Sequence, residues 1–82
     1  MQTPNGLKTK RINHLKWCLE QLKFRENMLL EEEFENLYRY IYGAVSKMEE
    51  MDGMAANEYF LKQMRKKDII ETLKRCNIEL DV

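Results

Sequence analysis

The residues in this chain that could bind a metal ion are one histidine and two cysteines. His14 and Cys18 are four positions apart, so on a helix they would lie one turn apart on the same face, and Cys76 could supply a third ligand. Protein zinc sites are normally built from two paired half-sites. Because the second half would here be a single cysteine, we predict no metal site. Cys18 and Cys76 are expected to be buried, reduced thiols and His14 a surface side chain.

A cluster of carboxylates, Glu31, Glu32, Glu33 and Glu35, invites comparison with acid–base catalysis or a site for two metal ions. Helical bundles that bind two metal ions use Glu-x-x-His pairs, and His14, the only histidine, does not follow any glutamate by three positions. The sequence also has no glycine-rich phosphate loop and no nucleophile with a base at a recognisable spacing. We therefore predict that the chain is not an enzyme, has no catalytic residues and binds no cofactor.

Basic side chains gather in two segments that could contact phosphate groups. The first lies near the N-terminus, with Lys8, Lys10, Arg11 and Lys16. The second lies near the C-terminus and consists of Lys62, Arg65, Lys66, Lys67, Lys74 and Arg75. However, the formal net charge of the chain is zero and residues 26–52 are predominantly acidic, which would repel DNA. Nucleic-acid binding through residues 62–75 is therefore the alternative function, and a solvated basic surface is the simpler explanation of these residues.

Trp17, Phe24 and Met28 form an apolar stripe on the first expected helix. Their spacings of seven and four place them on one side of it, away from the leucine stripe that begins at Leu15. Exposed aromatic and methionine side chains on a helix are typical of protein-binding surfaces. A helix wedged between two neighbours would instead bury both of its sides. Both interpretations remain open, and the first makes Trp17, Phe24 and Met28 the predicted partner-binding residues.

The helix that must organise the rest covers residues 34–51. Apolar residues recur there in steps of three and four, which is the helical period, at Phe34, Leu37, Ile41, Ala44, Met48 and Met51. The apolar positions cover roughly half of the helix circumference. Because a single neighbouring helix cannot cover a face that wide, the pattern predicts the central helix of a bundle.

The first helix is expected over about residues 7–26, with Asn5 as its N-cap. No proline or glycine interrupts residues 7–42, so one continuous helix to Met51, about 65 Å long, remains open. Such a rod would need a partner chain to bury it. We favour a break near Asn27, because Glu26 interrupts the apolar stripe and the acidic residues that follow suit a helix start.

The C-terminal part of the chain is predicted to form two short helices and a tail. Asp52-Gly53 is expected to end the central helix, since glycine commonly follows a helix C-terminus. A change of helical phase separates helices over 54–66 and 69–76, and Asp68 and Glu71 have the spacing of a capping box. Asn77 is expected to end the last helix. The tail alternates apolar and charged residues, so it is either an extended segment laid against the bundle or a single strand.

These patterns predict an all-α fold: a small helical bundle of three to four helices, about 7–26, 28–51, 54–66 and 69–76, with a short extended C-terminal tail. One domain would cover residues 1–82, with 1–6 and 77–82 peripheral. A chain of 82 residues with 44% apolar and 34% charged residues fits this class. The basic first helix and the acidic second helix are expected to pack antiparallel.

The expected function follows from the absence of catalytic patterns and from the wide apolar surface. We predict a small intracellular protein-binding regulator, of the inhibitor or adaptor type, that acts through helix-face contacts with another protein or as a homodimer. The alternatives are a nucleic-acid-binding module and a structural oligomerisation domain. No signal peptide or membrane-spanning run is visible, and two cysteines make no disulfide framework, so a cytoplasmic location without membrane contact is expected.

Overall fold

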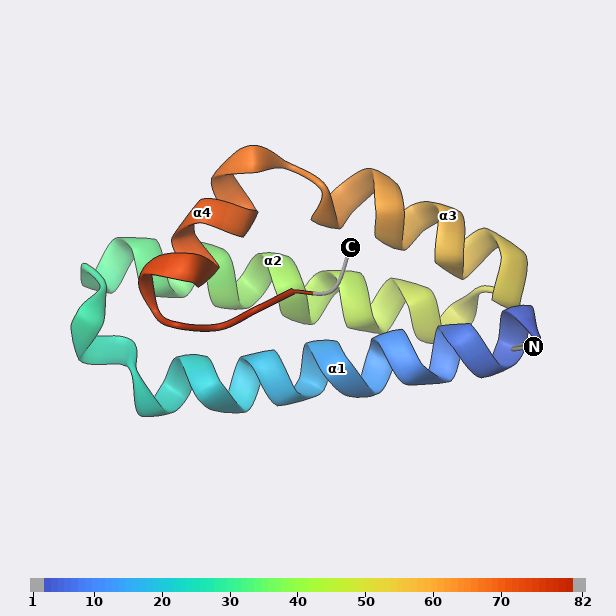
Figure 1. Cartoon of the computed structure of the whole chain (residues 1–82), viewed down its shortest axis with the longest axis horizontal. Helices are drawn as coiled ribbons and strands as arrows, with labels where there is room; N and C mark the ends of the chain where they lie inside the picture. Colours follow the sequence, from blue (N-terminus) through green and yellow to red (C-terminus); the bar gives the residue numbers. More distant parts are fainter. Residues whose placement is uncertain (1–2, 81–82) are drawn as a thin grey trace.

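The fold of the chain is an all-α bundle, as predicted. The computed structural model describes residues 3–80, which form four α-helices and one short 3-10 helix. The elements are α1 (Pro4–Phe24), η1 (Glu26–Met28), α2 (Glu31–Glu50), α3 (Gly53–Met64) and α4 (Lys67–Arg75). Figure 1 shows that α2 runs antiparallel to α1 and that α3 runs antiparallel to α2. α4 and the tail lie over the end of the bundle where α1 turns into α2. The expected antiparallel arrangement of the first two helices is therefore present.

The break between the first two helices lies where the sequence indicated, and a continuous helix to Met51 is excluded. α1 ends at Phe24, and η1 turns the chain through Glu26–Met28 before α2 begins. The second helix starts at Glu31 rather than at residue 28, because Leu30 is extended, with φ −64° and ψ 148°. The Glu33 carboxylate accepts a hydrogen bond of 3.2 Å from the Leu30 N–H and so caps the helix from inside.

The predicted N-cap of the first helix was wrong. Thr3, not Asn5, is the N-cap of α1, and its hydroxyl accepts a hydrogen bond of 3.0 Å from the Gly6 N–H. Pro4 occupies the first helical position, where its missing N–H costs nothing and its fixed φ suits the helix. The helix therefore starts three residues earlier than expected, and Asn5 lies within its first turn.

The predicted end of the central helix just before Asp52-Gly53 is confirmed, since α2 ends at Glu50, but Gly53 begins α3 and does not terminate α2. Asp52 is the N-cap of α3, and its carboxylate accepts a hydrogen bond of 2.9 Å from the Ala55 N–H. The predicted capping box at Asp68 and Glu71 does not form, because α4 already starts at Lys67 and Lys66 is its N-cap. Asp68 instead lies in the first turn, where a negative charge suits the helix dipole.

The end of α4 agrees with the prediction that Asn77 stops it. Asn77 has a left-handed φ of 59°, and its N–H donates to the Lys74 carbonyl. The Ile78 N–H donates to the Leu73 carbonyl at 2.9 Å, which completes a Schellman motif. Leu73 and Ile78 are both buried, as the apolar contact of that motif requires. The chain therefore reverses at Asn77 and is directed back over the bundle.

The tail is an extended segment laid against the bundle, and no strand occurs within residues 3–80. Ile78 is only 1% exposed, and Leu80 packs against the core. The His14 Nε2–H donates a hydrogen bond of 2.9 Å to the Glu79 carbonyl, which joins the tail to α1. The segment expected to be peripheral thus contributes Ile78 to the core. The ends of the two peripheral segments, residues 1–2 and 81–82, lie outside the described residues.

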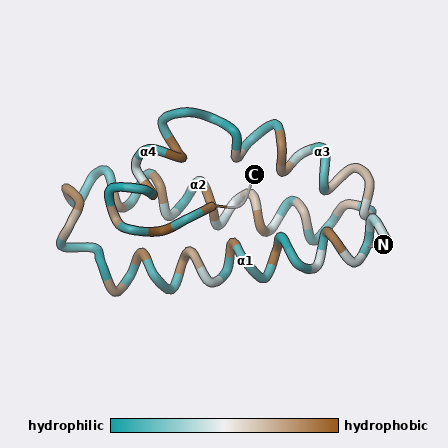
Figure 2. The backbone as a smooth tube through the Cα atoms, in the orientation of Figure 1, coloured by the Kyte–Doolittle hydropathy of each residue, from teal (hydrophilic) through white to brown (hydrophobic). Residues whose placement is uncertain are grey.

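The core runs along the centre of the bundle and draws on every α-helix. In Figure 2 the hydrophobic positions of α1 recur on the side that faces α2. The largest fully buried side chains are Leu15, Leu22, Ile41, Met48, Phe60, Met64, Leu73 and Ile78, joined by Cys18 and Cys76. No buried polar side-chain atom within residues 3–80 lacks a hydrogen-bond partner. The leucine stripe of α1 and most of the apolar face of α2 therefore match the buried sides of these helices.

Two glycines are expected to respond in opposite ways to alanine. Gly43 lies exposed in the middle of α2 with open space around it, so Gly43→Ala should raise the free energy of unfolding by about 0.5–1 kcal/mol. Gly53 is buried, and a Cβ there would lie 2.6 Å from the Asn5 backbone nitrogen. Gly53→Ala should therefore lower the free energy of unfolding by about 1–3 kcal/mol. Urea titrations of the two variants measure both, and equal effects would contradict the close approach of α1 and α3.

Candidate functional site

A group of exposed apolar side chains lies on α1 and the turn that follows it. Trp17 is 43% exposed, Phe24 81% and Met28 50%, so all three predicted partner-binding residues are on the surface. We call these three residues the α1 outer face. The remaining large apolar side chains exposed within residues 3–80 are Leu30, Tyr42 and Met54. Leu30 follows Met28 closely and extends the apolar surface around the turn.

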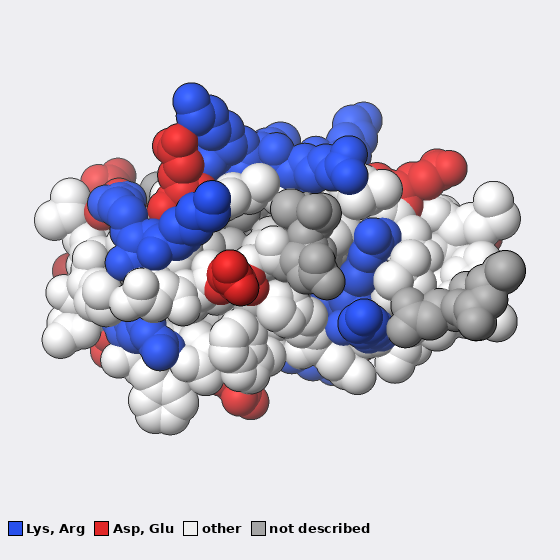
Figure 3. All heavy atoms as spheres, viewed as in Figure 1, with Lys and Arg blue, Asp and Glu red and all other residues white. Residues whose placement is uncertain are grey.

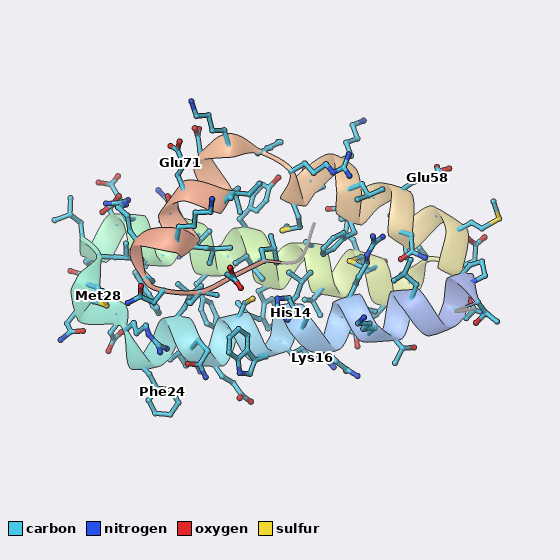
Figure 4. All side chains as sticks on the ribbon, in the orientation of Figure 1. His14, Lys16, Phe24, Met28, Glu58 and Glu71 are labelled. Carbon is cyan, nitrogen blue, oxygen red and sulfur yellow. The ribbon has the colours of Figure 1, made fainter. Side chains whose placement is uncertain are left out.

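The α1 outer face is exposed because the rest of the bundle packs against the other side of the helix. Ile12, Leu15, Leu19 and Leu22 are turned into the core, where α1 contacts α2 and α3. In Figure 4 the Phe24 side chain points away from the bundle, at the end of α1, and Met28 lies on the adjoining turn. The bundle thus leaves this side of α1 without a covering helix, unlike the wedged arrangement that the sequence left open.

The Trp17 ring is held in place by its own chain. It stacks on the His14 imidazole, with ring centroids 5.4 Å apart and an interplanar angle of 24°. His14 is fixed in turn by its hydrogen bond to the Glu79 carbonyl. A side chain that is already ordered loses less conformational entropy when a partner covers it. The tail therefore helps to present Trp17 in one orientation, a role that sequence spacing does not reveal.

Three charged side chains near the α1 outer face make contacts within the chain, whereas Glu20 lies exposed between Trp17 and Phe24. The Lys16 ammonium lies 3.6 Å from the Glu49 carboxylate, which is an exposed ion pair between α1 and α2. The Lys23 ammonium lies 5.5 Å from the centre of the Tyr38 ring, and the Arg25 guanidinium bonds the Gln21 side chain. In Figure 3 mostly uncharged atoms cover the C-terminal half of α1. A partner that covers both Trp17 and Phe24 would also have to accommodate the exposed Glu20 carboxylate.

The predicted phosphate contacts are partly used within the chain. Figure 3 shows Lys and Arg side chains gathered over the junction of α3 and α4. The Lys67 ammonium lies 3.8 Å from the Glu71 carboxylate, and the Arg75 guanidinium lies 2.7 Å from the Glu33 carboxylate. The Lys66 ammonium lies 5.5 Å from the centre of the Tyr40 ring. The remaining predicted phosphate contacts, Lys62, Arg65 and Lys74, are exposed.

The two cysteines are buried and free, and neither is exposed to solvent. Burial raises the pKa of the Cys18 thiol to about 11, and it also raises the pKa of the Cys76 thiol. His14, the third residue considered as a metal ligand, faces the tail. Within residues 3–80, no group of three or more His, Cys, Asp or Glu side chains is placed to hold a metal ion.

A shallow groove of about 390 Å³ separates α2 from α4 and was not foreseen from the sequence. Its lining consists of Glu33, Asn36, Leu37, Tyr40, Asp68, Ile69 and Thr72. The Tyr40 hydroxyl is 2.9 Å from the Gln63 carbonyl, to which it donates, so this side chain is committed to joining α2 and α3. The groove mixes an apolar floor with two carboxylates, and Glu33 is already paired with Arg75.

The Glu33 carboxylate is expected to make the stability of the fold depend on pH in the acidic range. The hydrogen bond from Arg75, and a second from the Leu30 N–H, lower the pKa of Glu33 below its ordinary value of 4.5. Because the folded-state pKa is lowered, the contribution to stability is fully present above pH 4.5 and is lost as the pH falls through the folded value. The melting temperature of Glu33→Gln should therefore approach that of the native chain in acid. Glu35→Gln, an exposed change on the same helix, is the control. A difference in melting temperature between Glu33→Gln and the native chain that stays the same in acid would contradict the ion pair between Glu33 and Arg75.

None of the helices within residues 3–80 is both long and apolar enough to cross a membrane. Comparisons with protein-family models, curated proteins and solved structures found no match for the chain. The α1 outer face is therefore interpreted from its own exposure, order and charge.

Proposed function

We propose that this chain is a small intracellular protein-binding regulator, of the inhibitor or adaptor type, which binds its partner through the α1 outer face. The observation that supports the proposal most strongly is the exposure of Trp17 and Phe24 on α1, whose other side is buried, together with the exposure of Met28 on the turn that follows it. Tryptophan is among the residues most enriched in binding hot spots. Its ordered position against His14 adds to the argument.

The size of this surface sets an expected affinity. From their exposed fractions, the three side chains offer roughly 350 Å² of surface, which would contribute about 9 kcal/mol on burial. Association costs about 4–15 kcal/mol in lost translational and rotational freedom, so this surface alone gives weak binding. A partner must therefore add contacts around it, for which the exposed Leu30 and Glu20 are available.

The proposal is tested with matched alanine variants used as bait in affinity capture followed by mass spectrometry. Trp17→Ala and Phe24→Ala should lose the partner while retaining the circular-dichroism spectrum and melting temperature of the native chain. Met54→Ala and Tyr42→Ala remove apolar side chains that are 67% and 59% exposed on other helices, so they should retain the partner. Equal capture by all four variants would contradict the proposal, and a large loss of stability in Phe24→Ala would place that ring in the core.

Nucleic-acid binding is the second candidate, favoured by the basic side chains gathered over the α3–α4 junction. Three of the six residues concerned, Lys66, Lys67 and Arg75, already contact side chains of their own chain, which weakens the case. A salt titration against random duplex DNA separates the two functions. Micromolar binding that weakens steeply with salt would support this candidate, and no binding at about 50 mM salt would end it.

A further inference from the structure

We propose that α4 and the tail, residues 67–80, form a lid that opens and closes as one unit while α1, α2 and α3 stay folded. The hinge consists of Arg65 and Lys66, which connect α3 to α4 and belong to neither helix. The lid also orders Trp17, because the ring of His14 both bonds the tail and stacks on Trp17. Its opening therefore regulates the α1 outer face, and this second part of the inference rests on the proposed function.

The lid covers the part of the bundle that α3 is too short to reach. α3 has 12 residues and is about 18 Å long, whereas α1 with 21 residues and α2 with 20 are each at least about 30 Å long. Figure 1 shows α3 over one half of the α1–α2 pair and α4 with the tail over the other half. The contacts agree, because Arg11 lies against Phe60 of α3 and His14 against Glu79 of the tail. Two separate segments thus cover the pair.

The hinge is exposed, and its fixed side is anchored. Residues 65–68 are four exposed positions in succession. Arg65 caps the end of α3, and Lys66 is extended, with φ −71° and ψ 130°. On the other side of Arg65, the Tyr40 hydroxyl of α2 donates to the Gln63 carbonyl at 2.9 Å, which holds the last turn of α3 in place. Rotation about two exposed residues therefore moves the lid without disturbing α3.

The lid is attached to the bundle by few contacts. The backbones of α1, α2 and α3 approach one another closely in all three pairings, whereas that of α4 makes no comparable approach to any of them. The groove of about 390 Å³ separates α4 from α2. Leu73, Cys76 and Ile78 are the fully buried side chains of the lid. Segments with few buried contacts and a low density of packing are those that open separately from the rest of a fold.

The polar contacts of the lid show what opening would change. The Arg75 guanidinium lies 2.7 Å from the Glu33 carboxylate of α2, in an exposed ion pair. The Glu79 carbonyl accepts the hydrogen bond of 2.9 Å from His14, whose ring stacks on Trp17. Opening breaks both polar contacts and leaves His14 without its partner in the tail. Trp17 therefore loses part of its order when the lid opens.

Cys76 is a built-in reporter of opening. It is the C-cap of α4 and is fully buried, so a thiol reagent reaches it only when the lid opens or the whole chain unfolds. The test is labelling of the native full chain with N-ethylmaleimide, and mass spectrometry identifies the modified cysteine. An open state populated at about 0.1–10% should slow the labelling of Cys76 about tenfold to a thousandfold relative to the unfolded chain. Labelling no faster than the global unfolding measured in urea permits would overturn the lid.

Two exposed ion pairs of α4 provide matched variants. Arg75→Gln removes the pair that joins the lid to α2, so Cys76 should be labelled about threefold to fivefold faster. Lys67→Gln removes the pair with Glu71 at 3.8 Å, which lies within α4 and moves with the lid. This control should change the labelling rate less than about twofold. Equal acceleration by the two variants would contradict an opening at the contact between α4 and α2.

Amide hydrogen exchange distinguishes a lid from fraying of the chain end. If the lid opens as one unit, the amides of Ile70, Leu73 and Cys76 should have protection factors within about threefold of one another. These should lie at least about tenfold below the protection factor of Phe60 in α3. Protection that instead falls steadily from Ile70 towards Cys76 would indicate fraying and would overturn the single unit.

The effect on Trp17 is tested by its fluorescence anisotropy. Ile78→Ala removes a buried side chain of the lid and should raise the open fraction at least about thirtyfold, so the anisotropy should fall. Glu79→Ala keeps the carbonyl that His14 binds, and it should leave the anisotropy unchanged. Faster labelling of Cys76 in Ile78→Ala at unchanged anisotropy would contradict the regulation of the α1 outer face.

The failure of this inference and that of the proposed function are distinguishable. If Cys76 reacts only by global unfolding while Trp17→Ala loses a captured partner, the lid is wrong and the proposed function stands. If Cys76 reacts through a separate opening while Trp17→Ala and Phe24→Ala retain every captured protein, the lid stands and the proposed function is wrong, together with the regulation that rests on it.

Discussion

Replacing Phe60 with alanine is expected to lower the free energy of unfolding by about 3–5 kcal/mol. The Phe60 side chain is 1% exposed, belongs to α3 and is the largest of the fully buried side chains. The Arg11 guanidinium of α1 lies 4.6 Å from the centre of its ring. Removing the ring would leave a cavity between α1 and α3 and would also remove that cation–π contact. For a domain of this size, whose total stability is about 5–15 kcal/mol, this is a large fraction.

Phe24→Ala is the matched control, because it makes the same chemical change on the surface. Phe24 is 81% exposed, so its loss should change the free energy of unfolding by no more than about 0.5 kcal/mol. Urea titrations followed by circular dichroism measure both variants under the same conditions. They should be made at a protein concentration low enough to keep the native chain monomeric. Equal destabilisation by the two variants would contradict the assignment of one ring to the core and the other to a binding surface.

Replacing Ile78 with alanine is expected to cost about 2–4 kcal/mol, although this residue lies only four positions before the last in the sequence. Ile78 is 1% exposed, and its N–H completes the Schellman motif at the end of α4. The substitution retains the backbone hydrogen bond and removes the buried side chain. The decrease in the free energy of unfolding therefore measures how much the packing of the tail against the core contributes to stability.

The control for the tail is Glu79→Ala. Its side chain is exposed, and the carbonyl that accepts the hydrogen bond from His14 is retained. This variant should unfold within about 0.5 kcal/mol of the native chain. If Ile78→Ala also fell within that range, the tail would be peripheral in solution, and it could not help to hold Trp17 through His14.

The central helix could be predicted because it carries one wide apolar face with a clear period, whereas α1 carries apolar side chains on both of its sides. Leu37, Ile41, Ala44 and Met48 recur at helical spacing and are all buried, and Glu26 marks the end of the first apolar stripe. The helix boundaries were harder, because contacts distant in sequence decide them. Gly53 is required where the start of α1 approaches α3, and nothing in the local sequence distinguishes that role from the end of a helix.

The sequence predicted which residues form the candidate surface, but it could not predict that they are exposed. The spacing of Trp17, Phe24 and Met28 predicted one side of a single helix, but α1 ends at Phe24 and Met28 lies in η1. The exposure of the three side chains also depends on where α3 and the tail pack. No local pattern contains that information. Leu30 was missed because nothing in the local sequence distinguishes it from Leu29, which is buried. The burial of Ile78 was missed because the tail alternates apolar and charged residues, which an exposed segment can also do.

The measurement that tests the central claim most directly is the quenching of Trp17 fluorescence by acrylamide. Trp17 is the only tryptophan in the chain, and it lies on the α1 outer face at 43% exposure, so its emission reports this surface alone. Quenching should be efficient in the dilute monomer. It should fall when a captured partner, or a high concentration of the chain itself, covers the face. Trp17 that remains equally quenchable in the complex would show that the partner binds elsewhere, and would contradict the account.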